Sequence, residues 1–139
     1  MSLIRLVYAS ESRLVEANRN DELDRILASA RLFNERNGIS GFLLSTDSAF
    51  AQVLEGPEQK VAETYGRIVV DQRHEALRLL AREPVAKRSF AGWAMGVAER
   101  NETTSFIFGL YGVTPERDLE AQPLDVLVDL ARELAQQPA

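Results

Sequence analysis

The chain has 139 residues, 45% of them hydrophobic and 27% charged, which indicates a single globular domain with one core. The net charge of −5 disfavours nonspecific binding to nucleic acid or to anionic membranes, since both are negatively charged. No cysteine is present, which excludes disulfides, thiol catalysis and thiolate metal sites, and the single histidine, His74, disfavours a zinc site or a histidine-based triad.

The N-terminal residues predict a strand that begins almost at once. Residues 3–9 are rich in Leu, Ile, Val and Tyr, and the two-residue period places Ile4, Leu6 and Tyr8 on one face. We find no signal peptide and no apolar stretch near the ~20 residues that a membrane span requires. We therefore expect a cytoplasmic protein that binds no membrane.

A long amphipathic helix is predicted over residues 21–36, after a polar loop over residues 10–20. Its apolar stripe has helical spacing and consists of Leu23, Ile26, Leu27, Ala30 and Phe33. Asn34 follows four residues after Ala30, which places its amide on or beside this stripe. Asn37-Gly38 is a typical helix end.

Two strands and a second helix come next. Residues 40–45 and 49–54 predict a hairpin, whose second strand places Phe50, Gln52 and Leu54 on one face. Pro57 suits the first turn of a helix that we expect to run to about residue 71. The inward-facing residues of this helix are Val61, Tyr65, Ile68 and Val69.

Residues 77–81 and 90–97 predict the fourth and fifth strands, and the fifth contains Trp93 and Met95. The order β-α-β-β-α-β plus a fifth strand is typical of a ferredoxin-like α+β fold with a helical tail. We expect residues 1–97 to form this domain and residues 98–139 to form a C-terminal extension. In the extension, residues 103–110 fit a helix or a strand, Thr114-Pro115-Glu116 suits a helix start, and a final amphipathic helix follows.

Three side chains that form hydrogen bonds, Tyr8, Asn34 and Gln52, stand at positions where the pattern calls for core. A buried amide without a partner costs roughly 2–7 kcal/mol, so these groups need one. In the split β-α-β arrangement the third strand lies between the first and second, so Tyr8 and Gln52 can face each other. Asn34 would join them from the first helix, and an apolar slot with converging polar groups is typical of a ligand site.

Each of these residues also has a purely structural interpretation. A tyrosine in a strand is usually a core residue whose hydroxyl binds backbone, and Asn34 suits the last turn of a helix. Gln52 suits a solvated sheet face, and residues 71–74 suit a solvated connector. Trp93 and Met95 suit the core.

Six motifs stand in order along the chain: Tyr8-Ala9-Ser10, Ala30-Arg31-Leu32-Phe33-Asn34, Gly38-Ile39-Ser40-Gly41, Phe50-Ala51-Gln52-Val53-Leu54-Glu55-Gly56, Asp71-Gln72-Arg73-His74 and Phe90-Ala91-Gly92-Trp93-Ala94-Met95-Gly96. Any one of them is a weak pattern, whereas the ordered set at these separations is specific. Over about residues 3–97 the chain resembles the BLUF family of flavin-binding blue-light sensors. The resemblance implies a noncovalently bound flavin between the two helices, usually FAD, with FMN and riboflavin as the alternatives.

The resemblance also implies roles for individual residues. Tyr8 would donate an electron and a proton to the excited flavin, and Gln52 would bridge Tyr8 and the flavin by hydrogen bonds. Trp93 and Met95 would lie near Gln52 and shift after light, with Ser10 supporting Trp93. The implied flavin-contacting residues are Asn34, Gln52, Ile26, Ile68, Arg31, Arg73 and His74.

These residue types suit a switch that makes no covalent bond to the flavin. A phenol has an ordinary pKa near 10, so it keeps its proton at neutral pH and becomes a strong acid only after losing an electron. An amide has a donor end and an acceptor end, so turning or tautomerising Gln52 changes what it offers. A new donor to the flavin would shift its spectrum slightly to the red. We therefore predict a photoreceptor and not an enzyme.

The expected output is a contact with another molecule. Residues 98–139 are too few for a cyclase or phosphodiesterase domain of ordinary size. We expect a downstream protein that the sequence does not identify, or self-association as a homo-oligomer. Trp93 and Met95 offer the route from Gln52 to the extension, and the final helix is expected mainly to cover the open sheet face.

Two other functions fit the same fold. One is a flavin-free dimerisation or small-ligand-binding module, which a colourless purified protein would indicate. The other is an acylphosphatase-type hydrolase. Its prediction is weak because the loop Ser10-Glu11-Ser12-Arg13 lacks the glycine-rich phosphate cradle that such an enzyme requires.

Overall fold

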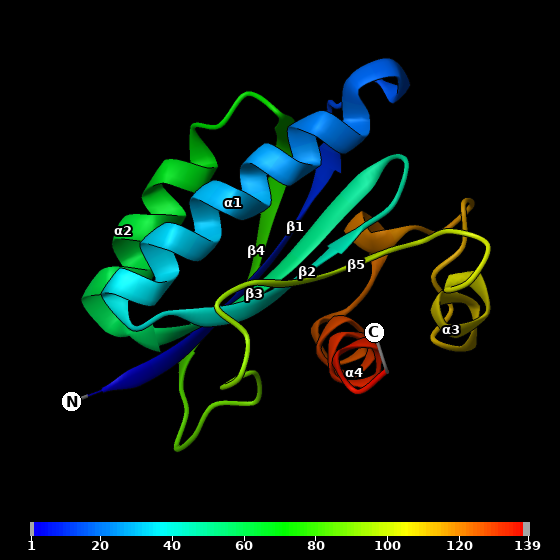
Figure 1. The fold of residues 1–139 in the computed structure, drawn as a ribbon. Helices are drawn as coiled ribbons and strands as arrows, with labels where there is room; N and C mark the ends of the chain where they lie inside the picture. The colour runs from blue at the N-terminus through cyan, green and yellow to red at the C-terminus, as the bar shows by residue number, and fades with distance from the viewer. Residues whose placement is uncertain (1, 138–139) are drawn as a thin grey trace.

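A computed structural model describes residues 2–137 and shows a five-stranded sheet with helices on both faces (Figure 1). The strands are β1 (Leu3–Ser12), β2 (Ser40–Ser45), β3 (Ala49–Pro57), β4 (His74–Pro84) and β5 (Gly96–Glu99). The α-helices are α1 (Arg19–Asn37), α2 (Glu58–Val69), α3 (Ser105–Leu110) and α4 (Leu124–Ala135). Two short 3-10 helices, η1 (Glu16–Asn18) and η2 (Leu119–Ala121), precede α1 and α4.

The strand order β4-β1-β3-β2-β5 confirms the predicted ferredoxin-like α+β topology with an added strand. β3 lies between β1 and β2 and pairs antiparallel with both, while β5 pairs parallel with β2 at the edge. In the β1–β3 register Tyr8 stands opposite Gln52. The predicted meeting of these two residues therefore follows from the topology.

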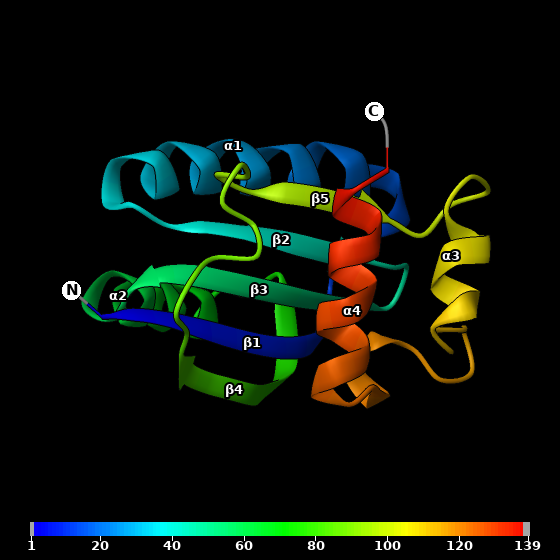
Figure 2. The same ribbon diagram turned by 90° about the horizontal axis from the view of Figure 1, so that it is seen from below.

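Helices α1 and α2 lie side by side on one face of the sheet, and α4 crosses the other face (Figures 1 and 2). Each face has its own apolar cluster. Leu6, Leu27 and Leu54 belong to the cluster beneath α1 and α2, while Leu127 and Leu130 of α4 belong to the other. The sheet is thus covered on both sides, as we expected of the final helix. Within residues 2–137, no helix is long and apolar enough to cross a membrane.

The boundaries of the first elements follow local chemistry. α1 ends at Gly38, whose φ of 69° is a left-handed conformation that glycine adopts without a steric cost. Pro57 ends β3 and stands at the N-cap of α2, because a residue without an N–H suits a helix start. The N-terminal strand is longer than predicted and runs through Ser12 into the region expected to be a loop.

The predicted fifth strand over residues 90–97 is wrong in its position. The strand is Gly96–Glu99, and the residues before it form a loop. Side chains and turns take up the backbone donors there: Phe90 N–H donates to the Glu55 carboxylate, and Trp93 N–H donates to the Phe90 carbonyl. Trp93 and Met95 therefore lie in this loop and not in a strand.

The C-terminal extension differs from expectation at one point. Residues 105–110 are helical, which resolves the ambiguity of that segment, but Thr114-Pro115-Glu116 starts no helix. Thr114 and Arg117 pair through their backbones and close a tight turn. The final helix begins after Pro123 instead, where the same N-terminal preference for proline applies.

Candidate functional site

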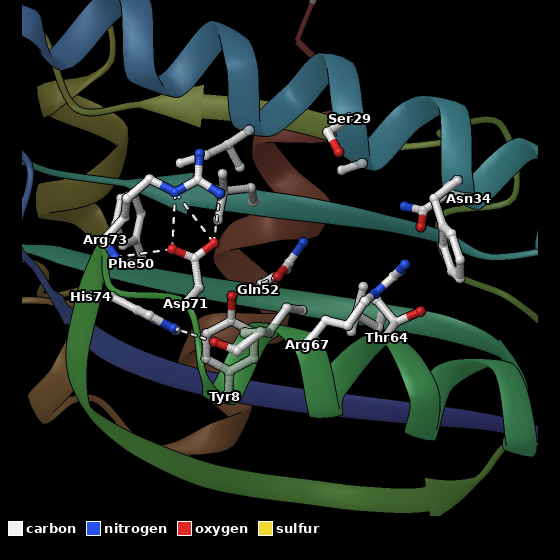
Figure 3. A pocket seen from close by; sticks show the side chains of 16 residues that line it. Tyr8, Ser29, Asn34, Phe50, Gln52, Thr64, Arg67, Asp71, Arg73 and His74 are labelled. Carbon is white, nitrogen blue, oxygen red and sulfur yellow. Dashed lines mark hydrogen bonds and ion pairs between the residues drawn. The ribbon is translucent and has the colours of Figure 1, made fainter.

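A cleft of about 290 Å³ opens between α1 and α2 above the sheet (Figure 3). Sheet residues form its floor, helix residues form its two walls, and the segment from α2 to β4 closes one end. The lining residues are Tyr8, Leu43, Phe50, Gln52 and Leu54 from the sheet, Ile26, Ser29, Ala30, Phe33 and Asn34 from α1, Thr64, Arg67 and Ile68 from α2, and Asp71, Arg73 and His74 from the closing segment. Apolar walls with a few polar groups are typical of a small-molecule site.

Tyr8 and Gln52 meet at the floor of the cleft. The Tyr8 hydroxyl donates to Gln52 Oε1 at 2.6 Å, and both side chains are buried. Burial, followed by the charges of Asp71 and Tyr65, raises the pKa of Tyr8 above its ordinary value of 10.0. The phenol is therefore neutral at physiological pH and acts as the donor in this bond.

Met95 occupies the other side of the Gln52 amide. Gln52 Nε2 donates to Met95 Sδ at 3.2 Å, and Met95 is only 2% exposed. Trp93 is 41% exposed and packs edge-on against Phe42, with 5.7 Å between ring centroids. The structure thus brings Met95, and not Trp93, to the amide.

Two side chains from the last turns of α1 bind the loop that carries Trp93 and Met95. The buried Asn34 side chain donates from Nδ2 to the Ala94 carbonyl at 2.7 Å. Arg31 Nε donates to the Met95 carbonyl at 3.0 Å. Asn34 lines the cleft, whereas Arg31 does not. Arg31 therefore holds the loop, and the flavin contact that the resemblance implied for it stays a prediction.

Asp71 and Arg73 form a compact ion pair at the end of the cleft. Arg73 Nη2 lies 2.6 Å from Asp71 Oδ2, and the Arg73 backbone N–H also donates to Asp71. The Arg73 hydrogen bond lowers the pKa of Asp71, and the same bond raises the pKa of Arg73. Arg73 also lies 3.7 Å from Glu22 of α1, so the pair ties the closing segment to that helix.

Both ring nitrogens of His74 have protein partners. Nε2 lies 2.7 Å from the Ile68 carbonyl, which only accepts, so this nitrogen carries a proton. Nδ1 lies 2.7 Å from Ser10 Oγ, so in the neutral ring the Ser10 hydroxyl donates to it. Ser10 therefore supports His74. The resemblance had implied that Ser10 supports Trp93 instead. His74 presents a ring face or edge to the cleft and has no ring nitrogen free for a ligand.

Several lining residues were not predicted from the sequence. Arg67 lies over the Phe33 ring, with its guanidinium carbon 3.5 Å from the ring centroid, and so joins α2 to α1 across the cleft. Thr64 and Ser29 line the walls, and Asp71 was interpreted as connector. Thr64 does carry a signal, since positions 61, 64, 65 and 68 have helical spacing. Long-range pairs such as Arg67 with Phe33 carry no local signal.

The chemistry of the lining suits a flat, heteroaromatic ligand. Ile26 of α1 and Ile68 of α2 line the cleft from opposite helices. Figure 3 shows amide and hydroxyl groups, among them Asn34 and Thr64, toward one end and the Asp71–Arg73 pair toward the other. Among residues 2–137, no group of three or more His, Asp or Glu side chains is arranged to hold a metal ion.

Comparison with known proteins gives a consistent match over this region. Residues 3–96 match the BLUF family, described as sensors of blue light using FAD. The chain is 36% identical over 93 residues to photoactivated adenylate cyclase subunit alpha of Euglena gracilis, covering 67% of this chain and 9% of that protein. It is 34% identical over 94 residues to the beta subunit of Euglena longa, covering 68% and 11%. The chain therefore spans only about a tenth of these relatives.

Among solved structures, BlsA and BlrB match nearly the whole chain. The photo-activated state of BlsA has a TM-score of 0.80 and 30% identity, covering 98% of this chain and 96% of that one. The dark state of BlrB, a BLUF protein, has a TM-score of 0.77 and 27% identity, covering 96% of both chains. Klebsiella pneumoniae BlrP1 with FMN and cyclic diGMP has a TM-score of 0.62 and 32% identity over 70% of this chain and 26% of that one. The likeness to BlsA and BlrB thus includes the C-terminal extension.

Proposed function

This chain belongs to the BLUF family of blue-light sensors that use a flavin, and from that membership we propose that the cleft between α1 and α2 holds FAD and that Tyr8, Gln52 and Met95 form its switch. The observation that carries the proposal is the continuous chain from Tyr8 through the Gln52 amide to Met95 Sδ, with bonds of 2.6 and 3.2 Å. The family is one of sensors, in agreement with the prediction that this domain is not an enzyme.

The residues that line the cleft suit particular contacts with a flavin. Ile26 and Ile68 would pack against the two faces of the ring, and Asn34 and Gln52 would bind its polar edge. Arg73 is held by Asp71 and would stand at the far end of the ring. These contacts stay predictions, as does the role of each residue in them.

The positive charge of Arg67 at the cleft favours FAD over riboflavin. Arg67 lines the cleft and is itself exposed to solvent, so its guanidinium is available to a phosphate. FAD and FMN carry phosphate, whereas riboflavin does not. The family description names FAD, which we take as the cofactor here.

A bound flavin supplies absorption of blue light and, when excited, accepts an electron from a nearby donor. The protein supplies the proton path. A tyrosine that has lost an electron is a strong acid, and the 2.6 Å bond leads its proton directly to Gln52 Oε1. Rotation or tautomerisation of Gln52 then exchanges donor and acceptor ends, which changes what it offers to Tyr8 and Met95. Burial of Tyr8 excludes water as a competing acceptor.

We propose that the output of the sensor runs through the C-terminal extension of residues 98–139, which we predict to follow a flavin-binding domain of residues 1–97. α4 packs on the sheet face opposite the cleft, so a change in the sheet reaches it directly. A protein partner or a second copy of the chain would receive the signal. The homo-oligomer and the cytoplasmic location stay predictions.

The first test is the visible absorption spectrum of the purified protein, in the dark and after blue light. We expect a flavin spectrum that shifts to the red in light and returns in the dark, with FAD released on denaturation and identified by mass. FMN in its place would correct the cofactor alone. A flavin spectrum without a reversible shift would contradict the switch, and a protein that stays colourless with added FAD would favour the flavin-free module.

A further inference from the structure

Glu55 is a buried carboxylate that the switch described above does not use. Its side chain has no solvent exposure. Arg5 of β1 donates to Oε2 from Nε at 3.0 Å and from Nη2 at 2.9 Å. The backbone N–H groups of Ser89 and Phe90 donate to the same carboxylate at 2.9 to 3.0 Å. The carboxylate thus joins β1, β3 and the loop before β5.

We propose that Glu55 is a positioning residue of the light switch: it anchors the loop over residues 85–95 and thereby sets the place of Met95 against Gln52. This inference rests on the proposed function. It adds a residue on the sheet face away from the cleft, whose carboxylate binds Ser89 and Phe90 of the loop.

The path from Glu55 to Met95 is short and continuous. Glu55 holds Phe90, whose carbonyl accepts from Trp93 N–H at 3.0 Å. The Trp93 carbonyl in turn accepts from Gly41 N–H of β2 at 3.0 Å, and Met95 follows two residues later. Each anchored residue is thus within a few bonds of the next, so movement at Phe90 is passed on to Met95.

A second cation strengthens the same anchor. Arg88 donates from Nη1 to Ser40 Oγ at 2.8 Å and to the Glu55 carbonyl at 3.1 Å, and from Nη2 to the Gly38 carbonyl at 2.5 Å. The loop is therefore bound to β3 through both the side chain and the backbone of one residue. Hydrogen bonds to a charged group are stronger than neutral ones, which suits a loop without strand pairing.

The alternation of side chains along β3 places the Gln52 amide and the Glu55 carboxylate on opposite faces of the sheet. Glu55 is three residues after Gln52, and an odd separation in a strand directs two side chains to opposite faces. Gln52 faces the cleft, while Glu55 lies on the face that α4 covers. Arg132 of α4 donates to Ser89 Oγ at 3.0 Å, as Arg5 does at 2.7 Å. Ser89, whose backbone N–H binds Glu55, therefore also contacts α4 through its hydroxyl.

The test compares Glu55→Gln with Glu58→Gln, a control at the exposed start of α2. The chain has one tryptophan, Trp93, on the anchored loop, so its accessibility to acrylamide reports the loop position. We expect Glu55→Gln to raise quenching of Trp93 and to change the dark-recovery rate by about threefold or more, because the coupling passes through a few bonds. We expect the Glu58→Gln control to change neither.

A double-mutant cycle separates positioning from a general loss of stability. In a Met95→Leu background, Glu55→Gln is expected to change the recovery rate by less than about 1.5-fold, since the group through which it acts is gone. An equal effect in both backgrounds, or wild-type quenching and recovery in Glu55→Gln, would overturn the proposal. If Glu55→Gln does not fold, Arg5→Lys replaces it in the same cycle and is judged by the same criterion.

The proposed function and this inference fail in different ways. Absence of a reversible red shift in the unmodified protein would contradict the switch itself. Quenching of Trp93 still reports on the anchor in that case, because it requires no photocycle. A protein that switches normally while Glu55→Gln leaves the loop and the recovery unchanged would contradict only the role of Glu55.

Discussion

At the scale of single residues, the hydrogen bond from Tyr8 to Gln52 is the centre of the proposed switch. We expect Tyr8→Phe to retain the flavin and to lose the reversible red shift, because the ring still fills its place but no longer offers an electron and a proton together. The loss of the hydroxyl leaves Gln52 Oε1 without its donor and costs about 1–3 kcal/mol of folding free energy. Difference absorption and denaturant unfolding measure the two effects.

Tyr65→Phe is the matched control. Its ring centroid lies 6.1 Å from that of Tyr8, so it makes the same chemical change beside the switch but outside the hydrogen-bond chain. We expect a normal red shift in this variant. A shift that survives in Tyr8→Phe, or is lost equally in both variants, would contradict the assigned role of Tyr8.

The buried phenol also predicts a dependence on pH. Its pKa is raised by burial above the ordinary value of 10.0, so the folded state keeps the proton after the unfolded state has lost it. The stability contributed by Tyr8 is therefore fully present below pH 10 and is lost as pH rises above it. The difference in free energy of unfolding between the protein and Tyr8→Phe should be flat below pH 10 and fall above it. A difference that stays flat to the most alkaline pH at which the protein remains folded would contradict this linkage.

Much of the candidate site could be predicted from the sequence, because the period of a strand or helix determines which face each residue occupies. Tyr8, Gln52, Ile26 and Ile68 occupy positions whose face is fixed by strand or helix period. Arg67 over Phe33 could not be predicted in this way, because the pair depends on how two helices pack. Ser10 with His74 likewise joins positions 64 residues apart.

At the scale of elements, the central hairpin leaves no room for one additional methyl group. A Cβ on Gly41 of β2 would stand 2.1 Å from the Val53 carbonyl oxygen, and this oxygen belongs to backbone that cannot move aside. We expect Gly41→Ala to destabilise the fold by about 1–3 kcal/mol, as overpacking does in a close-packed interior. It should also weaken the loop, because Gly41 N–H holds the Trp93 carbonyl.

Gly66→Ala provides the opposite control for that prediction. Gly66 lies in α2, where a Cβ would meet no atom within 4 Å beyond the adjacent backbone of its own helix, and alanine is the better helix former by about 1 kcal/mol. We expect this variant to be more stable in denaturant unfolding, while Gly41→Ala is less stable. Equal behaviour of the two variants would show that the close approach of β2 and β3 does not constrain the fold.

The position of the fifth strand could not be predicted from the sequence pattern. The run from Phe90 to Val97 has the composition of a strand, yet its first six residues form a loop. The reason is that Glu55, 35 residues before Phe90, takes the backbone donors that a strand would need. A periodic pattern contains no information about which distant side chain captures a backbone group. The cleft-lining helices and the hairpin could be predicted because their own periods determine them.

At the scale of the whole molecule, the extension is bound to the sheet by charge as well as by apolar packing. The buried Asp118 carboxylate, just before η2, accepts from Arg100 Nη2 and Thr46 Oγ1 at 3.0 Å each and from Ser48 Oγ at 2.8 Å. Thr46 and Ser48 lie in the β2–β3 turn, and Arg100 follows β5. Asp118 therefore binds the extension to the β2–β3 turn and to the residue that follows β5.

The same packing predicts that the flavin domain and the extension unfold as one unit. Leu130 of α4 is fully buried against the sheet, so we expect Leu130→Ala to lower the free energy of unfolding by about 2–5 kcal/mol. Because α4 lies on the face opposite the cleft, the native variant should still hold flavin and still switch. Denaturant unfolding followed in parallel by flavin absorbance and far-UV circular dichroism should show coincident transitions, both shifted to lower denaturant.

Leu110→Ala, on the exposed side of α3, makes the same chemical change at a residue that is 67% exposed and should leave both transitions in place. The alternative is an extension that unfolds independently of the flavin domain. In that case Leu130→Ala would shift only the circular dichroism, while flavin release would keep its original midpoint. That outcome would contradict direct coupling from the sheet to α4 and would require the signal to leave the flavin domain through another surface.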